Sequence, residues 1–170
     1  MKKLFFFFVS IVLILPAITY AQLKIGYVDS NTILKELPDA QDAQKTIDAL
    51  VQEWKDELQK MQKELDAQST DFEKRKLIMS DNKRLEVETQ INKLKTDINN
   101  YRQSKFGFQG ELYIQQEEIM KPVQNKIFLA IESVAEDEEL DYVFDRSGDI
   151  LFLYAKEDYD ITSLVLELLK

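Results

Sequence analysis

The residue types that carry most enzyme chemistry are missing from this sequence. Its 170 residues contain no cysteine and no histidine. Without cysteine there is no thiolate nucleophile, zinc thiolate or disulfide. Without histidine the chain lacks the commonest general base and the commonest transition-metal ligand. The four glycines form no phosphate-binding loop. We therefore expect no catalytic site and no cofactor.

Carboxylates are the remaining candidates for chemistry, because the chain has 31 acidic residues. The densest run, Glu136–Glu139 followed by Asp141, offers the oxygen ligands that Ca²⁺ prefers. It lacks the alternating aspartates and the glycine of a calcium-binding loop, so we prefer a solvated turn between a helix and a strand. Carboxylate pairs that could serve in acid–base catalysis are expected by chance at this abundance. We expect no metal site.

The overall charge is strongly negative. The whole chain carries −9, and its first 21 residues hold two lysines and no acid. The remainder has 20 basic and 31 acidic residues, a net charge of −11. Phosphate backbones repel such a chain, so we expect no nucleic-acid partner.

One segment opposes this charge and combines cations with apolar side chains. Residues 74–84 hold five basic residues and one acid, a local charge of +4. Methionine and exposed aliphatic side chains suit a surface that accepts many unfolded sequences, and cations can engage acidic segments or anionic headgroups. Alternatively, Leu77–Met79 close a turn against each other while the cations solvate it. The candidate binding residues are Phe72, Lys74, Arg75, Lys76, Leu77, Ile78, Met79, Lys83 and Arg84.

The N-terminus predicts an export signal. A short positive start precedes Leu4–Leu15, which is almost wholly apolar, and Thr19 and Ala21 are the small residues expected before a cleavage site. The alternative is an uncleaved membrane anchor. Pro16 argues against it, as does an apolar stretch at the lower limit for a membrane span. We predict a signal peptide over residues 1–21, cleaved after Ala21.

Two long amphipathic helices occupy the middle of the chain. Apolar residues recur three or four positions apart from Ala43 to Leu65, with Phe72 seven positions further on, and stripe positions again three or four apart run from Val87 to Val134, in the narrow stripe typical of a coiled coil. Ser80 and Asp81 interrupt the pattern as a turn and a helix cap. Two helices around a short turn predict an antiparallel hairpin, and arms of about forty residues would reach roughly 60 Å. We assign residues 39–135 to this projecting arm.

The second helix contains weak points. Gly107 and Gly110 each cost about 1 kcal/mol relative to alanine, and Pro122 costs about 3 kcal/mol in a helix interior. They predict either a kinked helix or a hinge that lets the arm spread. Lys105 and Gln115 occupy positions of the apolar stripe. They either set the register of the helices or, as we prefer, face a wet, splayed part of the hairpin.

Both ends of the exported chain predict strands. Leu23–Asp29, Tyr142–Asp145 and Ile150–Tyr154 have strand-like patterns, and residues 146–149 form a turn between the last two. Capping residues also predict short helices, one ending before Pro38 and one following Asp160. For the chain to close, the first strand must join the C-terminal pair.

Three strands and a short helix make a very small body, for which oligomerisation is the usual remedy. Ile150–Tyr154 is apolar on both faces, as for a strand buried between subunits. We assign residues 22–38 and 136–170 to a β-rich oligomerisation body. The fold class is α+β, with a long antiparallel α-helical coiled-coil hairpin projecting from a small oligomeric β body. The predicted interface residues are Ile25, Tyr27, Val143, Phe144, Ile150, Phe152 and Tyr154.

These segments resemble the Skp/OmpH family of periplasmic chaperones. Lys24–Asp29 with Pro38 is similar to the family's opening strand and turn, residues 126–145 to its last helix and following strand, and Asp160–Leu166 to its terminal helix. The arms match in pattern only. The resemblance covers essentially all of the exported chain.

The resemblance implies a periplasmic homotrimer whose pooled strands form a body and whose three arms surround a cavity. It implies a holdase that works without ATP, binds unfolded outer-membrane proteins and makes only transient membrane contact. The best-known members are basic, whereas this chain has a pI of about 4.7. We therefore transfer no lipopolysaccharide-binding residues.

A competing function is an exported coiled-coil spacer or adaptor between envelope components. A spacer should have uniformly polar arm surfaces. Phe106, Tyr113, Ile114 and the run Leu77–Met79 lie off the apolar stripe, which favours a client-binding surface. An enzyme of unknown type is the least favoured alternative.

Overall fold

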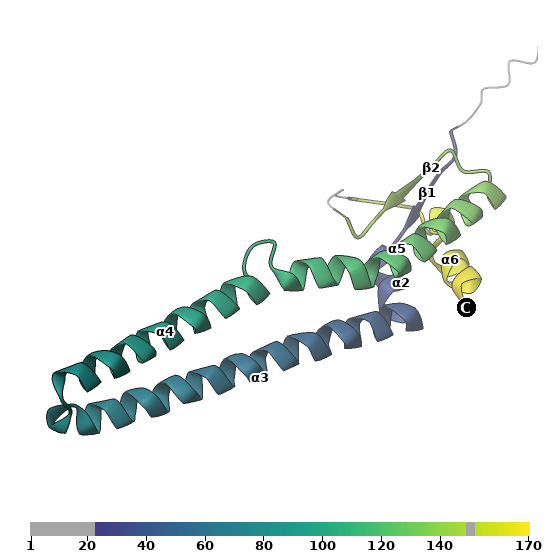
Figure 1. Cartoon of the computed structure of the whole chain (residues 1–170). Helices are drawn as coiled ribbons and strands as arrows, with labels where there is room; N and C mark the ends of the chain where they lie inside the picture. Colours follow the sequence, from purple (N-terminus) through teal and green to yellow (C-terminus); the bar gives the residue numbers. More distant parts are fainter. Residues whose placement is uncertain (1–22, 149–151) are drawn as a thin grey trace, which may run out of the picture.

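The computed structural model describes residues 23–148 and 152–170 (Figure 1). The predicted signal peptide, residues 1–21, lies outside this part of the chain. The elements follow in the order β1 (Ile25–Val28), α2 (Ser30–Glu36), α3 (Pro38–Arg75), α4 (Asp81–Phe106), α5 (Glu111–Asp137), β2 (Tyr142–Asp145) and α6 (Thr162–Leu169), with 3₁₀ turns at Lys76–Ile78 and Glu157–Tyr159.

The two ends of the chain meet in a small parallel sheet. Ile25 of β1 lies opposite Tyr142 of β2, and Val28 lies opposite Asp145. On the other edge of β1, the Ile161 amide donates to the Tyr27 carbonyl at 2.9 Å. The sequence correctly predicted that the first strand joins the C-terminal segment.

The third predicted strand is not formed where the structure describes it. Phe152–Tyr154 is irregular, and Leu153 and Tyr154 are exposed. Ile150 lies outside the described residues. A strand that is apolar on both faces needs a layer on each side, and a single chain supplies none for the second face. The described sheet therefore has two strands instead of three.

The body has a compact core beside this sheet. Its buried apolar residues come from β1, α2, α5, α6 and the first turns of α3: Val28, Ile33, Leu37, Ala40, Ala43, Val123, Ile127, Ala130, Val134, Ile161, Val165 and Leu169. Ile33 and Val165 are fully buried. The helices that form the arm thus contribute their bases to the core of the body.

Side-chain hydrogen bonds tie the two chain ends together. Asp29 caps α2 by accepting from the Thr32 amide at 3.0 Å, and its own amide donates to Thr162 Oγ1 at 2.9 Å. Asp145 accepts from the Ser30 amide at 3.2 Å and from Ser30 Oγ at 2.5 Å. Burial alone would raise the pKa of Asp145, but hydrogen bonds from Ser30 and Ser147 outweigh it and lower that pKa. Asp145 is therefore held as an anion.

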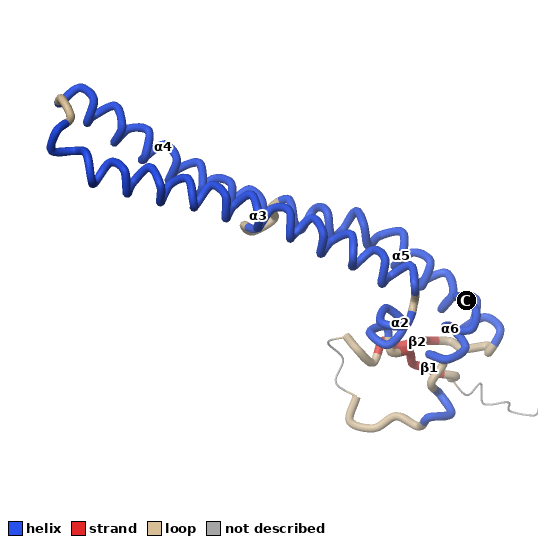
Figure 2. The backbone as a smooth tube through the Cα atoms, turned by 90° about the horizontal axis from the view of Figure 1, so that it is seen from below, coloured by secondary structure: helices blue, strands red, loops and turns tan. Residues whose placement is uncertain are grey.

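The arm consists of α3 lying alongside α4 and then α5, as Figures 1 and 2 both show. Pro38 opens α3 at a position where its missing N–H is harmless. Ser80 caps α4 as the sequence predicts, accepting from the Lys83 amide. A second cluster, with Leu65, Phe72, Ile91 and Ile98 buried, fills the distal seam. No helix among the described residues is long and apolar enough to cross a membrane.

The second long helix is broken, which corrects one position of the predicted stripe. Residues 107–110 separate α4 from α5 and form a loop visible in Figure 1. Phe108, predicted to lie in the seam, is 96% exposed. The other predicted seam positions, before and after the break, are buried or half-buried. The helical period continues on each side of the break, and the break moves only the Phe108 side chain out of the seam into solvent.

Candidate functional site

The turn at the end of the arm presents two aliphatic side chains to solvent. Leu77 is 89% and Ile78 is 85% exposed. Met79 is half-buried against the distal cluster, and Phe72 is buried within it. The structure therefore removes Phe72 from the predicted binding surface, because α3 directs its side chain into the seam towards α4. The exposed apolar surface of the tip reduces to Leu77 and Ile78, with the edge of Met79.

The cations of the tip are largely paired with acids three or four residues away in the sequence. The ion pairs are Arg75 with Asp71 at 3.0 Å, Lys76 with Glu73 at 2.6 Å, Lys83 with Glu86 at 2.9 Å and Arg84 with Asp81 at 3.6 Å. Hydrogen bonding and attraction from Lys83 lower the pKa of the Glu86 carboxyl. Residues 71–86 hold five basic and four acidic residues, so the local charge is +1. Three acids just outside residues 74–84 offset most of the +4 that the shorter stretch suggested.

The face of the sheet that points away from the helices carries aromatic side chains. The Phe152 ring lies 6.1 Å from Tyr27 and 6.4 Å from Phe144, and Phe144 stacks on Tyr142 at 6.4 Å. Arg146 lies over the Tyr27 ring at 5.8 Å. Burial, reinforced by the Asp160 carboxylate, raises the pKa of Tyr27.

An apolar groove of about 630 Å³ runs along this aromatic face, lined partly by Ile25, Tyr27, Phe152 and Tyr154. Five of the predicted interface residues thus gather on one side of the sheet. Val143 does not join them: it points the other way and packs against the core of the body. Pleat alternation causes this, since neighbours in a strand face opposite sides.

The helix break is fixed by two glycines. A Cβ on Gly107 would lie 2.3 Å from the Gln103 carbonyl oxygen, and one on Gly110 would lie 2.8 Å from the Ser104 carbonyl oxygen. Gln109 between them has a φ of 52°. Pro122, the third predicted hinge residue, lies inside α5, which continues past it. The break therefore needs glycine at both positions.

The seam beside the break is closed by an aromatic contact. Trp54 of α3 is buried, and its ring meets Phe106 edge-on at 6.0 Å. Lys105 Nζ lies 4.5 Å from the Trp54 ring, a cation–π contact. Phe106, predicted to be off the stripe, is thus used in packing. Gln115 is half-buried and donates to Glu111 at 3.1 Å.

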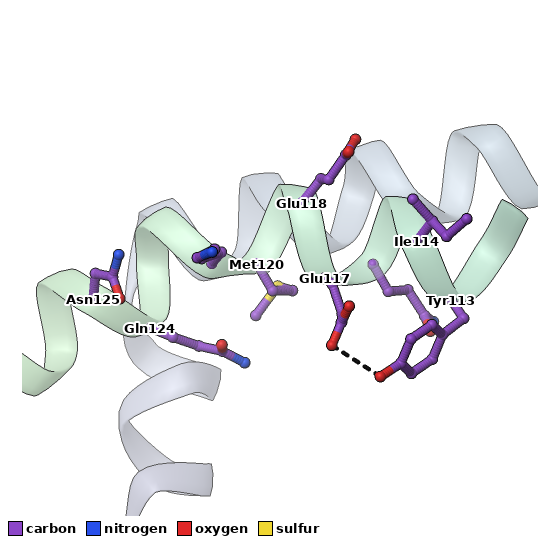
Figure 3. A pocket seen from close by; sticks show the side chains of 9 residues that line it. Tyr113, Ile114, Glu117, Glu118, Met120, Gln124 and Asn125 are labelled. Atoms are coloured by element: carbon purple, nitrogen blue, oxygen red, sulfur yellow. Dashed lines mark hydrogen bonds between the residues drawn. The ribbon is translucent and has the colours of Figure 1, made fainter. Parts of the chain in front are cut away.

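A further surface lies on α5, and only some of its residues could be recognised from the sequence. A groove of about 650 Å³ lies along this helix. Figure 3 shows its lining side chains, from Tyr113 and Ile114 at one end to Gln124 and Asn125 at the other. The Tyr113 hydroxyl donates to Glu117 at 2.9 Å, which raises the pKa of Tyr113. Tyr113 and Ile114 were recognisable as apolar residues off the stripe. The polar residues of the groove carried no signal of their own.

The acidic run ends a helix in the structure. Glu139 has a φ of 53° and forms an ion pair with Lys24 at 2.6 Å, and that contact lowers the pKa of Glu139. Among residues 23–148 and 152–170, no group of three or more carboxylates is placed to hold a metal ion.

Comparison with known proteins agrees with this architecture. The chain is similar to the solved structure of a candidate outer membrane chaperone, described as OmpH-like, from Caulobacter crescentus CB15. The two superpose with a TM-score of 0.72 over 88% of this chain and 85% of the other, at 15% identity, a likeness of fold. No protein of curated function matches significantly. Residues 24–169 match the family model described as outer membrane protein (OmpH-like), and the chain therefore belongs to this OmpH-like family.

Proposed function

We propose that the protein is an ATP-independent periplasmic holdase chaperone, which binds unfolded outer-membrane proteins and prevents their aggregation on the way to the outer membrane. One observation carries the proposal: the long arm exposes large apolar side chains both at its tip and partway along it. Leu77 and Ile78 lie at its tip, and Phe108, Tyr113 and Ile114 lie at and after the helix break. Membership of the OmpH-like family supports the same function.

The arm suits a binder that must also release its client. Burial of apolar surface contributes about 25 cal/mol per Å². Small exposed patches spread along a two-helix arm therefore give many weak contacts in place of one tight site. An unfolded chain can occupy several of them together and leave them one at a time, so release needs no ATP.

The proposed assembly is a homotrimer formed through the body. Among the described residues, one face of the sheet has no second layer. This face carries the groove beside Tyr27 and Phe152, and the side chains of Ile25, Tyr142 and Tyr154 are exposed on it. Equivalent faces of three chains could cover one another, with Phe152 and Tyr154 between them. The signal peptide, cleaved after Ala21, would deliver the chain to the periplasm.

An aggregation assay tests the function. An unfolded outer-membrane β-barrel is diluted from denaturant with and without the mature protein, and light scattering is recorded in the absence of ATP. The proposal requires that the wild type suppress scattering at near-stoichiometric ratios. Unchanged scattering would contradict the holdase and favour the spacer or adaptor, which needs no affinity for unfolded chains.

A further inference from the structure

The groove on α5 differs in chemistry from the arm tip. Its apolar part is formed by Tyr113, Ile114 and Met120, of which Tyr113 is 50% and Ile114 is 44% exposed. No residue of α3 or α4 lines it: all its lining residues lie between 113 and 125 on α5. Figure 3 shows these side chains distributed along α5. Because neither α3 nor α4 contributes to the lining, a chain could lie in the groove without displacing the seam.

The polar residues of the groove suit an extended backbone. Gln116, Gln124 and Asn125 line it together with the apolar side chains. Each side-chain amide has a carbonyl oxygen that accepts and an NH₂ group that donates. An unfolded segment exposes backbone N–H and C=O groups regardless of its sequence, and these amides can satisfy both kinds.

The charge around the groove is negative. Glu117 and Glu118 line it, with Lys121 as the single cation. The stretch that lines it, residues 113–125, contains two acidic residues and one basic residue, a local charge of −1, whereas residues 71–86 at the tip carry +1. The groove therefore attracts segments that contain lysine or arginine and repels acidic ones.

We propose that this groove docks an extended segment of unfolded polypeptide in which apolar side chains alternate with lysine or arginine. The inference rests on the proposed holdase function and specifies which part of a client this portion of the arm takes. Apolar client side chains contact Tyr113, Ile114 and Met120, while the basic ones pair with Glu117 and Glu118.

Two labelled peptides of equal length test the charge preference. One alternates leucine with lysine and the other alternates leucine with glutamate, and each is titrated with the full mature protein while fluorescence anisotropy is measured at low and physiological salt. We expect the basic peptide to bind more tightly and to lose affinity as salt rises. Equal affinity for the two peptides, or tighter binding of the acidic one, would overturn the inference.

Paired variants locate the site. The double variant Glu117→Gln/Glu118→Gln keeps an acceptor for the Tyr113 hydroxyl and removes two charges, and should weaken basic-peptide binding about fivefold, as expected for two exposed ion pairs. The control Glu132→Gln/Glu136→Gln removes two charges from the same helix outside the groove and should leave affinity within twofold. An equal loss in both variants would refute the assignment to this groove.

A third variant separates the client from other occupants. Tyr113→Ser/Ile114→Ser should weaken both peptides while the mass of the assembly stays the same. A change in that mass would mean that a second copy of the chain covers the groove, which overturns the inference. Aggregation suppression by the wild type is measured in parallel. If the wild type suppresses aggregation but shows no preference between the peptides, the inference about the groove is wrong and the proposed holdase function is retained. If the wild type does not suppress aggregation, the holdase function is wrong, and the peptide titrations still test whether the groove binds basic segments.

Discussion

The body and the distal arm of this protein are built on different amounts of buried surface. In the body, five elements enclose Ile33 and Val165 completely, and side-chain hydrogen bonds join residues more than a hundred positions apart. In the distal arm, two helices share a single seam, and the ion pairs connect residues three or four positions apart. The body is therefore specified by long-range contacts, whereas the distal arm is held largely by local ones and can expose apolar groups without losing its fold.

The largest expected effect is on assembly, and it should be confined to the body. Phe152→Asp places a charge where the ring packs against Tyr27 and Phe144. In the proposed trimer, an unpaired charge between subunits costs several kcal/mol, about 3 to 5 in comparable cases, so that assembly should dissociate. The matched arm variant is Phe108→Asp, at a side chain that is fully exposed within the chain. Sedimentation should show loss of assembly in the first and an unchanged mass in the second. If the Phe152→Asp and Phe108→Asp variants had the same mass, the effect on assembly would not be specific to the body, which would contradict the prediction.

The same truncation should cost more in the body than in the arm. Ile33→Ala removes a side chain enclosed on all sides, and we expect it to lower the free energy of unfolding by about 2 to 5 kcal/mol. Ile91→Ala lies in the two-helix seam, where neighbours can relax and water can enter, so we expect the lower end of that range. Urea unfolding followed by circular dichroism measures both. Equal losses would mean that the seam is packed as tightly as the core.

Acid should destabilise the body through Asp145. Its pKa is lowered in the folded state below the ordinary value of 3.8, so its hydrogen bonds contribute full stability above pH 3.8 and lose it as the pH falls through the lower, folded pKa. Asp145→Asn should cost about 1 to 3 kcal/mol at pH 7, because bonds to a charged acceptor are lost. The difference in the free energy of unfolding between Asp145→Asn and the wild type should decrease below pH 3.8. In the arm, Glu86→Gln should change stability little at either pH, because its carboxylate is exposed. A pH-independent gap for Asp145→Asn would contradict the assignment.

The smallest effect on stability is expected at the tip. Leu77→Ser/Ile78→Ser should alter the free energy of unfolding by no more than about 0.5 kcal/mol, since both side chains are already in solvent. We expect the same variant to suppress client aggregation less well than the wild type. Phe72→Ala is the control from the buried side of the same turn and should cost stability, about 3 kcal/mol. Undiminished suppression by the serine variant would place capture along the arm and away from the tip.

Charge reversal at the tip gives a weaker test. Because most tip cations are paired and residues 71–86 sum to +1, changing Lys74, Arg75 and Lys76 to glutamate should reduce binding of acidic clients modestly.

Added salt should leave the wild-type affinity for acidic clients unchanged or strengthen it, because the chain as a whole is acidic. A steep loss with salt would show that attraction at the tip dominates over the net charge.

The sequence predicted the local elements well because their signals are local. The period of apolar residues gave α3 and most of α4 and α5, and Asp29 and Ser80 gave helix starts that the structure confirms. Gly107 and Gly110 predicted a weak point in the second helix, but the sequence pattern does not distinguish a kinked helix from one that is interrupted. The clash of a Cβ at Gly107 with the Gln103 carbonyl exists only in the folded loop, and so does the ejection of Phe108.

The sequence by itself determined the lack of thiol and imidazole chemistry, the acidic charge, the long helices and the meeting of the two chain ends. Tertiary structure decided the burial of the apolar residues that the stripe and the predicted interface placed wrongly. Phe106, predicted off the stripe, packs against Trp54, whereas Phe108, predicted in the seam, is exposed, and Val143 packs against the core of the body. The physical reason is that burial depends on which partner element approaches each face. That is a property of the three-dimensional arrangement of the helices and the sheet, and neighbouring residues along the chain do not encode it.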